Sequence, residues 1–229
     1  MTSESTIATA RGSRRLCIWA TLYVLAWLSG LAAGPARPLN PTTSQLHSFY
    51  LESGGAALIQ ALLVHGIAGV ALVGMAQGVS RANASQRLSR WAFGTGLGAA
   101  IASWGQAGIA AVTVLSVASM TPEGTLGLVH AIDRLDSLKL LLLAAFVTTV
   151  TAVLRHNGFT ARWLTASATL LAPMLASGAV AFFVSNPALD TVLAGSLVLL
   201  LVWALAIAWI IRPRRAPAVL RNRQSPPSA

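Results

Sequence analysis

Residues 136–155 read DSLKLLLLAAFVTTVTAVLR, an apolar run that an arginine closes. Between Lys139 and Arg155 this run contains no charged side chain. A helix of about 20 such residues covers roughly 30 Å, the thickness of the hydrocarbon core of a bilayer. Five further runs have the same character. The sequence therefore predicts six spanning helices, at residues 16–34, 56–78, 91–118, 136–154, 163–184 and 188–211.

The composition of the whole chain agrees with a lipid environment. Of its 229 residues, 55% are hydrophobic and only 10% are charged, whereas soluble domains average about 25% charged residues. Spanning segments satisfy their own backbone hydrogen bonds as helices. The predicted fold class is all-α, a polytopic transmembrane helix bundle with an N-terminal segment (1–15), a six-helix domain (16–211) and a basic disordered tail (212–229).

The basic residues are distributed unevenly between the two ends of the predicted helices. Of 16 lysines and arginines, all but Arg37, Arg134 and Lys139 fall at one class of helix end or on the tail. The positive-inside rule predicts that this end is cytoplasmic, that both termini face the cytoplasm, and that the protein lies in a plasma or bacterial inner membrane. The basic rim would contact anionic lipid headgroups. Nucleic acid is not an expected partner, because the basic residues have no aromatic-interleaved groove around them.

The first apolar run has an alternative interpretation, and it contains the one cysteine of the chain. Arg14 and Arg15 precede an apolar stretch that small residues follow, so residues 16–34 could instead be a cleaved signal peptide. Cys17 is the single cysteine, which excludes an intrachain disulfide and a multi-cysteine metal site. No metal and no cofactor is predicted.

The fourth helix is predicted to be longer than a membrane is thick. Thr121 and Pro122 form a helix-start signal, with Glu123 in the first turn. A helix from Pro122 to Leu154 would measure roughly 50 Å. Its first turns must project outward, tilt, or line a water-filled vestibule.

Pairs of glycines predict where helices pack closely. Gly74 and Gly78 in the second span, and Gly94 and Gly98 in the third, form small-xxx-small patterns. With the short connection between these spans, the pattern predicts a tightly packed hairpin, and homodimerisation is the alternative.

Polar residues recur at one depth in five of the predicted spans. Each lies about sixteen residues, or roughly 24 Å, from the nearest arginine at the predicted cytoplasmic end. They are His65, Gln106, Lys139, Ser177 and Ser196.

The fourth span adds further ionisable residues in HAIDRLDSLK, residues 130–139. Helical geometry places His130, Asp133 and Arg134 on one face, with Ser137, and places Asp136 with Lys139 on a neighbouring edge. The predicted polar site contains Glu52, His65, Gln106, His130, Asp133, Asp136 and Lys139.

Each of these residues also has a structural interpretation. Asp136 and Lys139 could be an interfacial ion pair with the lysine side chain extended to water. His65 could be a hydrogen-bonded packing residue, and Gln106 could bridge two helices.

Charged side chains inside a membrane commonly mark ion or substrate routes. The first hypothesis is therefore a small transporter, permease or small-molecule-handling protein with an outward-facing site. The alternatives are a membrane enzyme using Asp133 or Asp136 with a histidine in acid/base catalysis on a lipid or isoprenoid, and an accessory subunit of a membrane complex. Haem ligation by His65 and His130 is disfavoured, because His130 would lie too far outward.

Overall fold

The computed structural model describes residues 3–35, 37–38, 41–81, 85–158, 161–184 and 186–210, and only the backbone for residues 3–13. Within these ranges every regular element is helical. The predicted tail at 212–229 lies outside the described residues.

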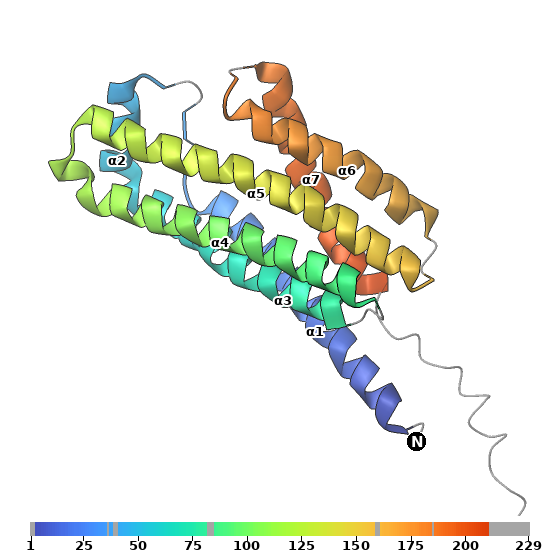
Figure 1. Cartoon of the computed structure of the whole chain (residues 1–229). Coiled ribbons are helices and arrows are strands. Elements are labelled where there is room, and N and C mark those ends of the chain that lie inside the picture. The colour runs from blue at the N-terminus through green and yellow to red at the C-terminus, as the bar shows by residue number, and fades with distance from the viewer. Residues whose placement is uncertain are drawn as a thin grey trace, which may run out of the picture.

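The described residues form nine helical segments (Figure 1). They are α1 (Ser3–Ala32), α2 (Thr43–Ala61), the π-helix η1 (Leu62–Ile67), α3 (Ala68–Arg81), α4 (Gln86–Ser116), the 3-10 helix η2 (Val117–Ser119), α5 (Pro122–His156), α6 (Arg162–Ala181) and α7 (Pro187–Ile210). Because α2, η1 and α3 are continuous, the described part of the chain has six rods that are long and apolar enough to cross a membrane. This confirms the prediction of six helices of spanning length and composition.

The rods pack in chain order and close into a ring. Each rod contacts the next along the chain, and α1 also contacts α7. The ends of the rods that carry Arg81, Arg87, Arg90, Arg155 and Arg162 lie together and are called the basic end below (Figure 1).

Two helices at the opposite end begin with a side-chain cap, and the first of these caps was predicted from the sequence. The Thr121 hydroxyl accepts a hydrogen bond from the backbone N–H of Gly124 at 3.1 Å. The Asn186 side chain accepts one from the backbone N–H of Ala188 at 2.9 Å. In both cases proline is the first helical residue, where its missing N–H costs nothing.

The rods differ in length, and the difference creates a step at the end opposite the basic end. The rod of α2, η1 and α3 has 39 residues and α5 has 35, whereas α6 has 20. Figure 1 shows α2, α4 and α5 continuing past the ends of α1, α6 and α7. A small apolar cluster joins this three-helix projection; its buried members are Leu46, Tyr50, Val117 and Val129. The first turns of α5 thus extend past α1, α6 and α7 while packed against α2 and α4.

The main hydrophobic core lies between the step and the basic end. Trp203, Phe146, Leu171 and Ile207 are almost completely buried there, and the rings of Phe146 and Trp203 meet edge to face with centroids 6.3 Å apart. Residues from α1, α3, α4, α5, α6 and α7 all contribute. This core separates the step from the basic end.

The glycine pair of α3 packs against α1. A Cβ at Gly74 would lie 2.3 Å from the Trp19 ring, and one at Gly78 would lie 3.1 Å from Leu16. Gly74 and Gly78 therefore mark a close helix contact, but the partner is α1 and not α4, the partner that the predicted hairpin requires.

Other glycines bring α3 and α4 together. A Cβ at Gly96 would lie 2.6 Å from that of Ala76 on α3. Gly98 faces Leu142 on α5, and a Cβ at Gly94 would meet nothing within 4 Å. The hairpin forms, but assigning its packing to Gly94 and Gly98 is wrong, because a helix in a ring has two neighbours and spacing alone does not distinguish them.

Candidate functional site

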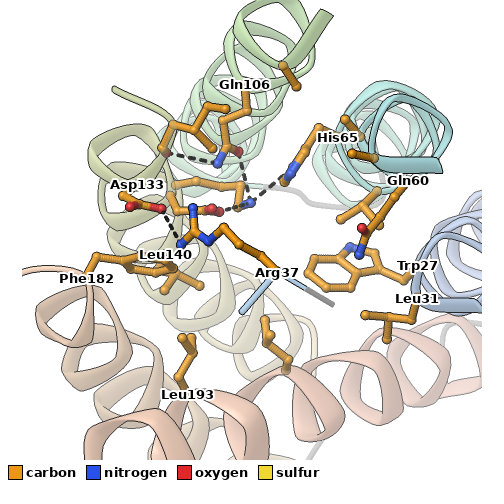
Figure 2. A pocket seen from close by; sticks show the side chains of 18 of the residues that line it. Trp27, Leu31, Arg37, Gln60, His65, Gln106, Asp133, Leu140, Phe182 and Leu193 are labelled. Carbon is orange, nitrogen blue, oxygen red and sulfur yellow. Dashed lines mark hydrogen bonds and ion pairs between the residues drawn. The ribbon is translucent and has the colours of Figure 1, made fainter. Parts of the chain in front are cut away.

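A cavity of about 290 Å³ lies at the step, where α1, α6 and α7 end beside the projecting helices (Figure 2). Its walls are largely aromatic and aliphatic, with Trp27, Phe49, Tyr50 and Phe182 among them. Six polar side chains also line it: Arg37, Gln60, His65, Gln106, Asp133 and Asp136, together with Lys139 at its floor. Small-molecule sites commonly combine an apolar wall with a few convergent polar groups.

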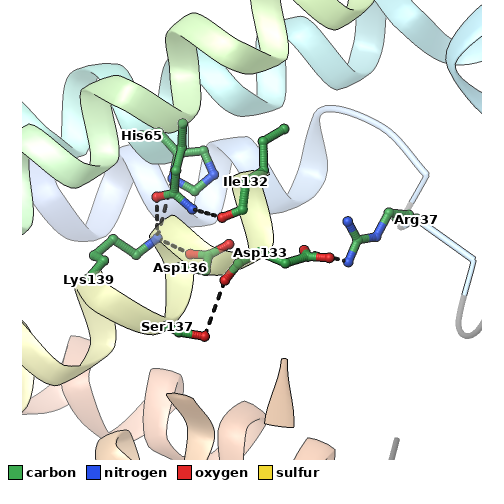
Figure 3. Close-up of polar contacts among 8 residues, drawn as sticks. Arg37, His65, Ile132, Asp133, Asp136, Ser137 and Lys139 are labelled. Carbon is green, nitrogen blue, oxygen red and sulfur yellow. Dashed lines mark hydrogen bonds and ion pairs between the residues drawn. The ribbon is translucent and has the colours of Figure 1, made fainter. Parts of the chain in front are cut away.

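The floor of the cavity is organised around Lys139 of α5, which is only 3% exposed. Its ammonium group donates to the Gln106 Oε1 atom at 3.0 Å and forms an ion pair with Asp136 (Figure 3). The His65 Nδ1 atom lies 3.4 Å away, and the Trp27 ring centroid lies 6.0 Å from the ammonium nitrogen. The ion pair with Asp136 is therefore present, but the lysine points into the bundle and does not extend to water.

Gln106 connects this floor to the helix backbone. Its side chain is completely buried, and its amide nitrogen donates to the Ile132 carbonyl of α5 at 3.3 Å while its oxygen accepts from Lys139. The amide thus bridges α4 and α5 and also holds the lysine. The bridge between two helices expected from the sequence is therefore present, and the same side chain lines the cavity.

The π-helix η1 presents His65 to the cavity. A π turn widens the helix, and such turns occur frequently at functional sites. The Trp104 indole donates to the Gly66 carbonyl in this turn at 3.2 Å. A Cβ at Gly69 would lie 2.7 Å from the indole nitrogen, so glycine is needed there for the ring to approach.

An ion pair spans the mouth of the cavity. The Arg37 guanidinium lies 3.0 Å from the Asp133 Oδ1 atom, with the two side chains 37% and 17% exposed. Arg37 belongs to the segment between α1 and α2, and Figure 2 shows its guanidinium reaching toward Asp133.

Arg37 was not among the site residues expected from the sequence. It is 96 residues from Asp133 along the chain, so no helical spacing connects the two. The available signal was its position: Arg37 and Lys139 are two of the three basic residues that break the end-of-helix pattern, and each pairs with an α5 carboxylate.

Two of the predicted site residues lie elsewhere. Glu52 is exposed and does not line the cavity. His130 is exposed too, and it lines a separate hollow with Arg134 and Ile109 on the outside of α4 and α5. The structure therefore does not bring Glu52 and His130 into the cavity with the other predicted residues. Asp133 lines the cavity, whereas His130 and Arg134 line the second hollow.

The serines of the predicted polar layer also point elsewhere. Ser177 is exposed, and the Ser196 hydroxyl donates to the Leu193 carbonyl of its own helix at 2.7 Å. Ser137, which was predicted on a face of the fourth span and not in this layer, donates to the Ala179 carbonyl of α6 at 2.8 Å. Of the five helices expected to meet at this depth, three contribute their predicted residue: His65, Gln106 and Lys139.

The positions of the histidines and acids limit the metal chemistry of the site. His65 and His130 line different hollows, so the two rings do not face each other across a haem-sized space. Among the described residues, no group of three or more His, Cys, Asp or Glu side chains is placed to hold a metal ion.

The arrangement is suited to binding a small molecule with a polar group and an apolar part. The floor and mouth offer charges of both signs, and the walls offer aromatic surface. His65, Lys139 and Asp136 also form a continuous chain of groups that can carry protons.

Compared with models of protein families, with curated proteins and with solved structures, the chain has no match in any of the three.

Proposed function

We propose that the protein is a multi-pass plasma-membrane or inner-membrane transporter that takes up a small molecule in the cavity at the step. The proposal orients the basic end toward the cytoplasm by the positive-inside rule, which makes the cavity accessible from the outer side. Trp27 of α1 lines the cavity, which supports a first helix that is retained as part of the bundle.

The observation that carries the proposal is the charged floor of the cavity. Ionisable side chains inside an apolar bundle are costly, and they usually mark a substrate or ion pathway. A buried ion pair is weak as a source of stability compared with well-packed apolar residues. Lys139 and Asp136 nevertheless adjoin an open volume of about 290 Å³, which packing alone does not require.

We take the described state to be one side of the proposed transport cycle. The cavity adjoins the partly exposed pair of Arg37 and Asp133, whereas the main apolar core lies between it and the basic end. In the proposed orientation this is an outward-facing state. Passage to the cytoplasm requires a second state in which the core opens.

The test is substrate flux in liposomes that contain the purified full-length protein. Small organic cations, carboxylates and amino acids are offered in turn, and uptake or substrate-induced current is recorded. We expect flux for one of these classes, lost in Asp136→Asn and retained in Asp190→Asn, which changes an acid of α7 outside the cavity. Ligand binding without flux for every class would overturn transport and leave a binding protein.

A membrane enzyme acting on a lipid or isoprenoid is the second candidate. The contact between His65 and Lys139 favours it, because two proton-carrying groups 3.4 Å apart beside a carboxylate could perform acid/base catalysis. Incubation of the liposomes with extracted membrane lipids, followed by mass spectrometry, tests this candidate. A product formed by the wild type and not by His65→Gln, with His130→Gln as the control, would favour the enzyme over the transporter.

A further inference from the structure

The two carboxylates of the cavity are more exposed than Lys139, the cation at its floor. Lys139 has three N–H donors, and three acceptors surround it: Gln106, Asp136 and His65. Its hydrogen-bonding capacity is therefore used within the protein. Asp133 and Asp136 are 17% and 19% exposed, so both carboxylates remain accessible from the cavity.

The remaining cation of the cavity comes from outside the helices. Arg37 lies on the segment between α1 and α2 and extends a guanidinium group to Asp133. Asp133 and Asp136 are three residues apart on α5, so they lie on neighbouring positions of one helix face. A cation entering the cavity would meet the same carboxylate that Arg37 now occupies.

The walls also suit a positively charged organic group. Trp27, Phe49 and Tyr50 line the cavity, and aromatic faces attract ammonium groups through their ring quadrupoles. The ammonium of Lys139 already lies 6.0 Å from the centroid of Trp27. A carboxylate ligand would have to separate Arg37 from Asp133 and would then lie beside two carboxylates, while the protons of Lys139 are engaged.

We infer that the cavity binds a small organic amine, whose ammonium group displaces the Arg37 guanidinium from Asp133 while its apolar part packs against the aromatic walls. Arg37 is then a tethered competitor that fills the cation position when no ligand is present. The inference rests on the cavity being the ligand site of the proposed function, but it does not require that the ligand is transported.

Three probes of similar size test the charge preference. They are 2-phenylethylamine, 3-phenylpropionate and 3-phenylpropanol, which carry a positive, a negative and no charge at neutral pH. Binding to the full-length protein in detergent is measured by isothermal titration calorimetry. The amine is expected to bind in preference to the carboxylate and the alcohol.

The variants separate the competitor from the carboxylate. Arg37→Gln should tighten amine binding by about tenfold, because the guanidinium no longer competes with the amine for Asp133. Asp133→Asn should weaken it by about tenfold or more through loss of the ion pair. Arg134→Gln, which changes an exposed arginine of α5 outside the cavity, should leave it unchanged.

Each other outcome would overturn the inference. Preferential binding of 3-phenylpropionate would refute the amine and leave the ligand pocket of the proposed function standing. Weaker amine binding in Arg37→Gln would refute the competitor role, and this variant keeps the test decisive if Asp133→Asn does not fold. Absence of binding by all three probes, in wild type and Arg37→Gln alike, would refute the inference, while the flux measurement decides separately on transport.

Discussion

A single lysine side chain determines how the polar floor is assembled. Lys139 is buried at 3% exposure, and its contacts come from η1, α4 and its own helix. Taking an ammonium and a carboxylate out of water costs several kcal/mol for each ion, and their attraction offsets this cost only when the remaining hydrogen bonds are made. The pair is therefore a fixed constraint on the packing of α4 and α5.

Replacing the lysine alone should be more damaging than replacing the pair. Lys139→Met leaves the Asp136 carboxylate without its cation, and we expect a loss of about 3–5 kcal/mol in the free energy of unfolding. The double variant Lys139→Met with Asp136→Leu should recover most of this loss, because no uncompensated charge remains. Denaturant unfolding in detergent micelles, followed by circular dichroism, measures both.

The matched control for this pair is Arg134→Met. Arg134 is an exposed cation on the same helix, so its replacement should change the unfolding free energy by no more than about 0.5 kcal/mol. If the double variant were as unstable as the single one, the ion pair would not be the source of the effect.

Spacing along a helix predicted the depth of the site residues but not the direction in which their side chains point. Depth from the basic end correctly grouped His65, Gln106 and Lys139, because the rise per residue is nearly constant. It also included Ser177 and Ser196, which point elsewhere, because depth says nothing about rotation around the helix axis. Arg37 could not be found this way, since it lies between helices.

At the scale of a helix, one π turn in the second rod was not predicted from the sequence. The η1 segment interrupts an otherwise continuous helix from Thr43 to Arg81, and its apolar composition contains no signal for the interruption. Trp104 of α4 donates a hydrogen bond to the Gly66 carbonyl within this turn, and the absence of a side chain at Gly69 leaves room for the indole ring. Tertiary packing thus selects a local geometry that the local sequence does not specify.

The contact between α1 and α3 depends on the absence of a side chain at Gly74. A Cβ there would lie 2.3 Å from the Trp19 ring, so Gly74→Ala forces the helices apart and should cost about 1–3 kcal/mol of unfolding free energy. A Cβ at Gly94 meets nothing within 4 Å. Gly94→Ala should therefore be neutral or stabilising by up to about 1 kcal/mol through helix propensity.

Thermal and denaturant unfolding of the two variants side by side provides the measurement. If Gly74→Ala and Gly94→Ala changed the unfolding free energy equally, the effect would come from replacing a helix glycine in general and not from the contact with Trp19.

At the scale of the whole molecule, the six rods could be counted from the sequence because each contains its own apolar run. The closure of the ring through α1 and α7, and the step between long and short rods, could not. These features depend on contacts between residues far apart in the chain, such as the Cys17 thiol and the Ala208 carbonyl at 3.1 Å. Periodicity within one helix carries no information on such pairs.

The proposed orientation can be tested with single cysteines. Cys17→Ser supplies the background, since a serine hydroxyl can also donate to the Ala208 carbonyl. Arg134→Cys and Asn186→Cys should react with a membrane-impermeant maleimide added to intact cells, whereas His156→Cys, at the basic end, should react only after the membrane is opened. Labelling of position 156 in intact cells would reverse the orientation.

The unequal rods also give the two flanks of the bundle different hydrophobic lengths. α6 has 20 residues and covers about 30 Å, whereas the 31 residues of α4 cover about 46 Å. Large apolar side chains remain exposed near the far end of α4, with Leu115 at 79%. In the proposed membrane setting, a bilayer of one thickness matches only one flank of an upright bundle, so mismatch would be relieved by leaning or by local thickening of the lipid. Under the same proposal, membrane thickness would set how deep the cavity lies below the headgroups.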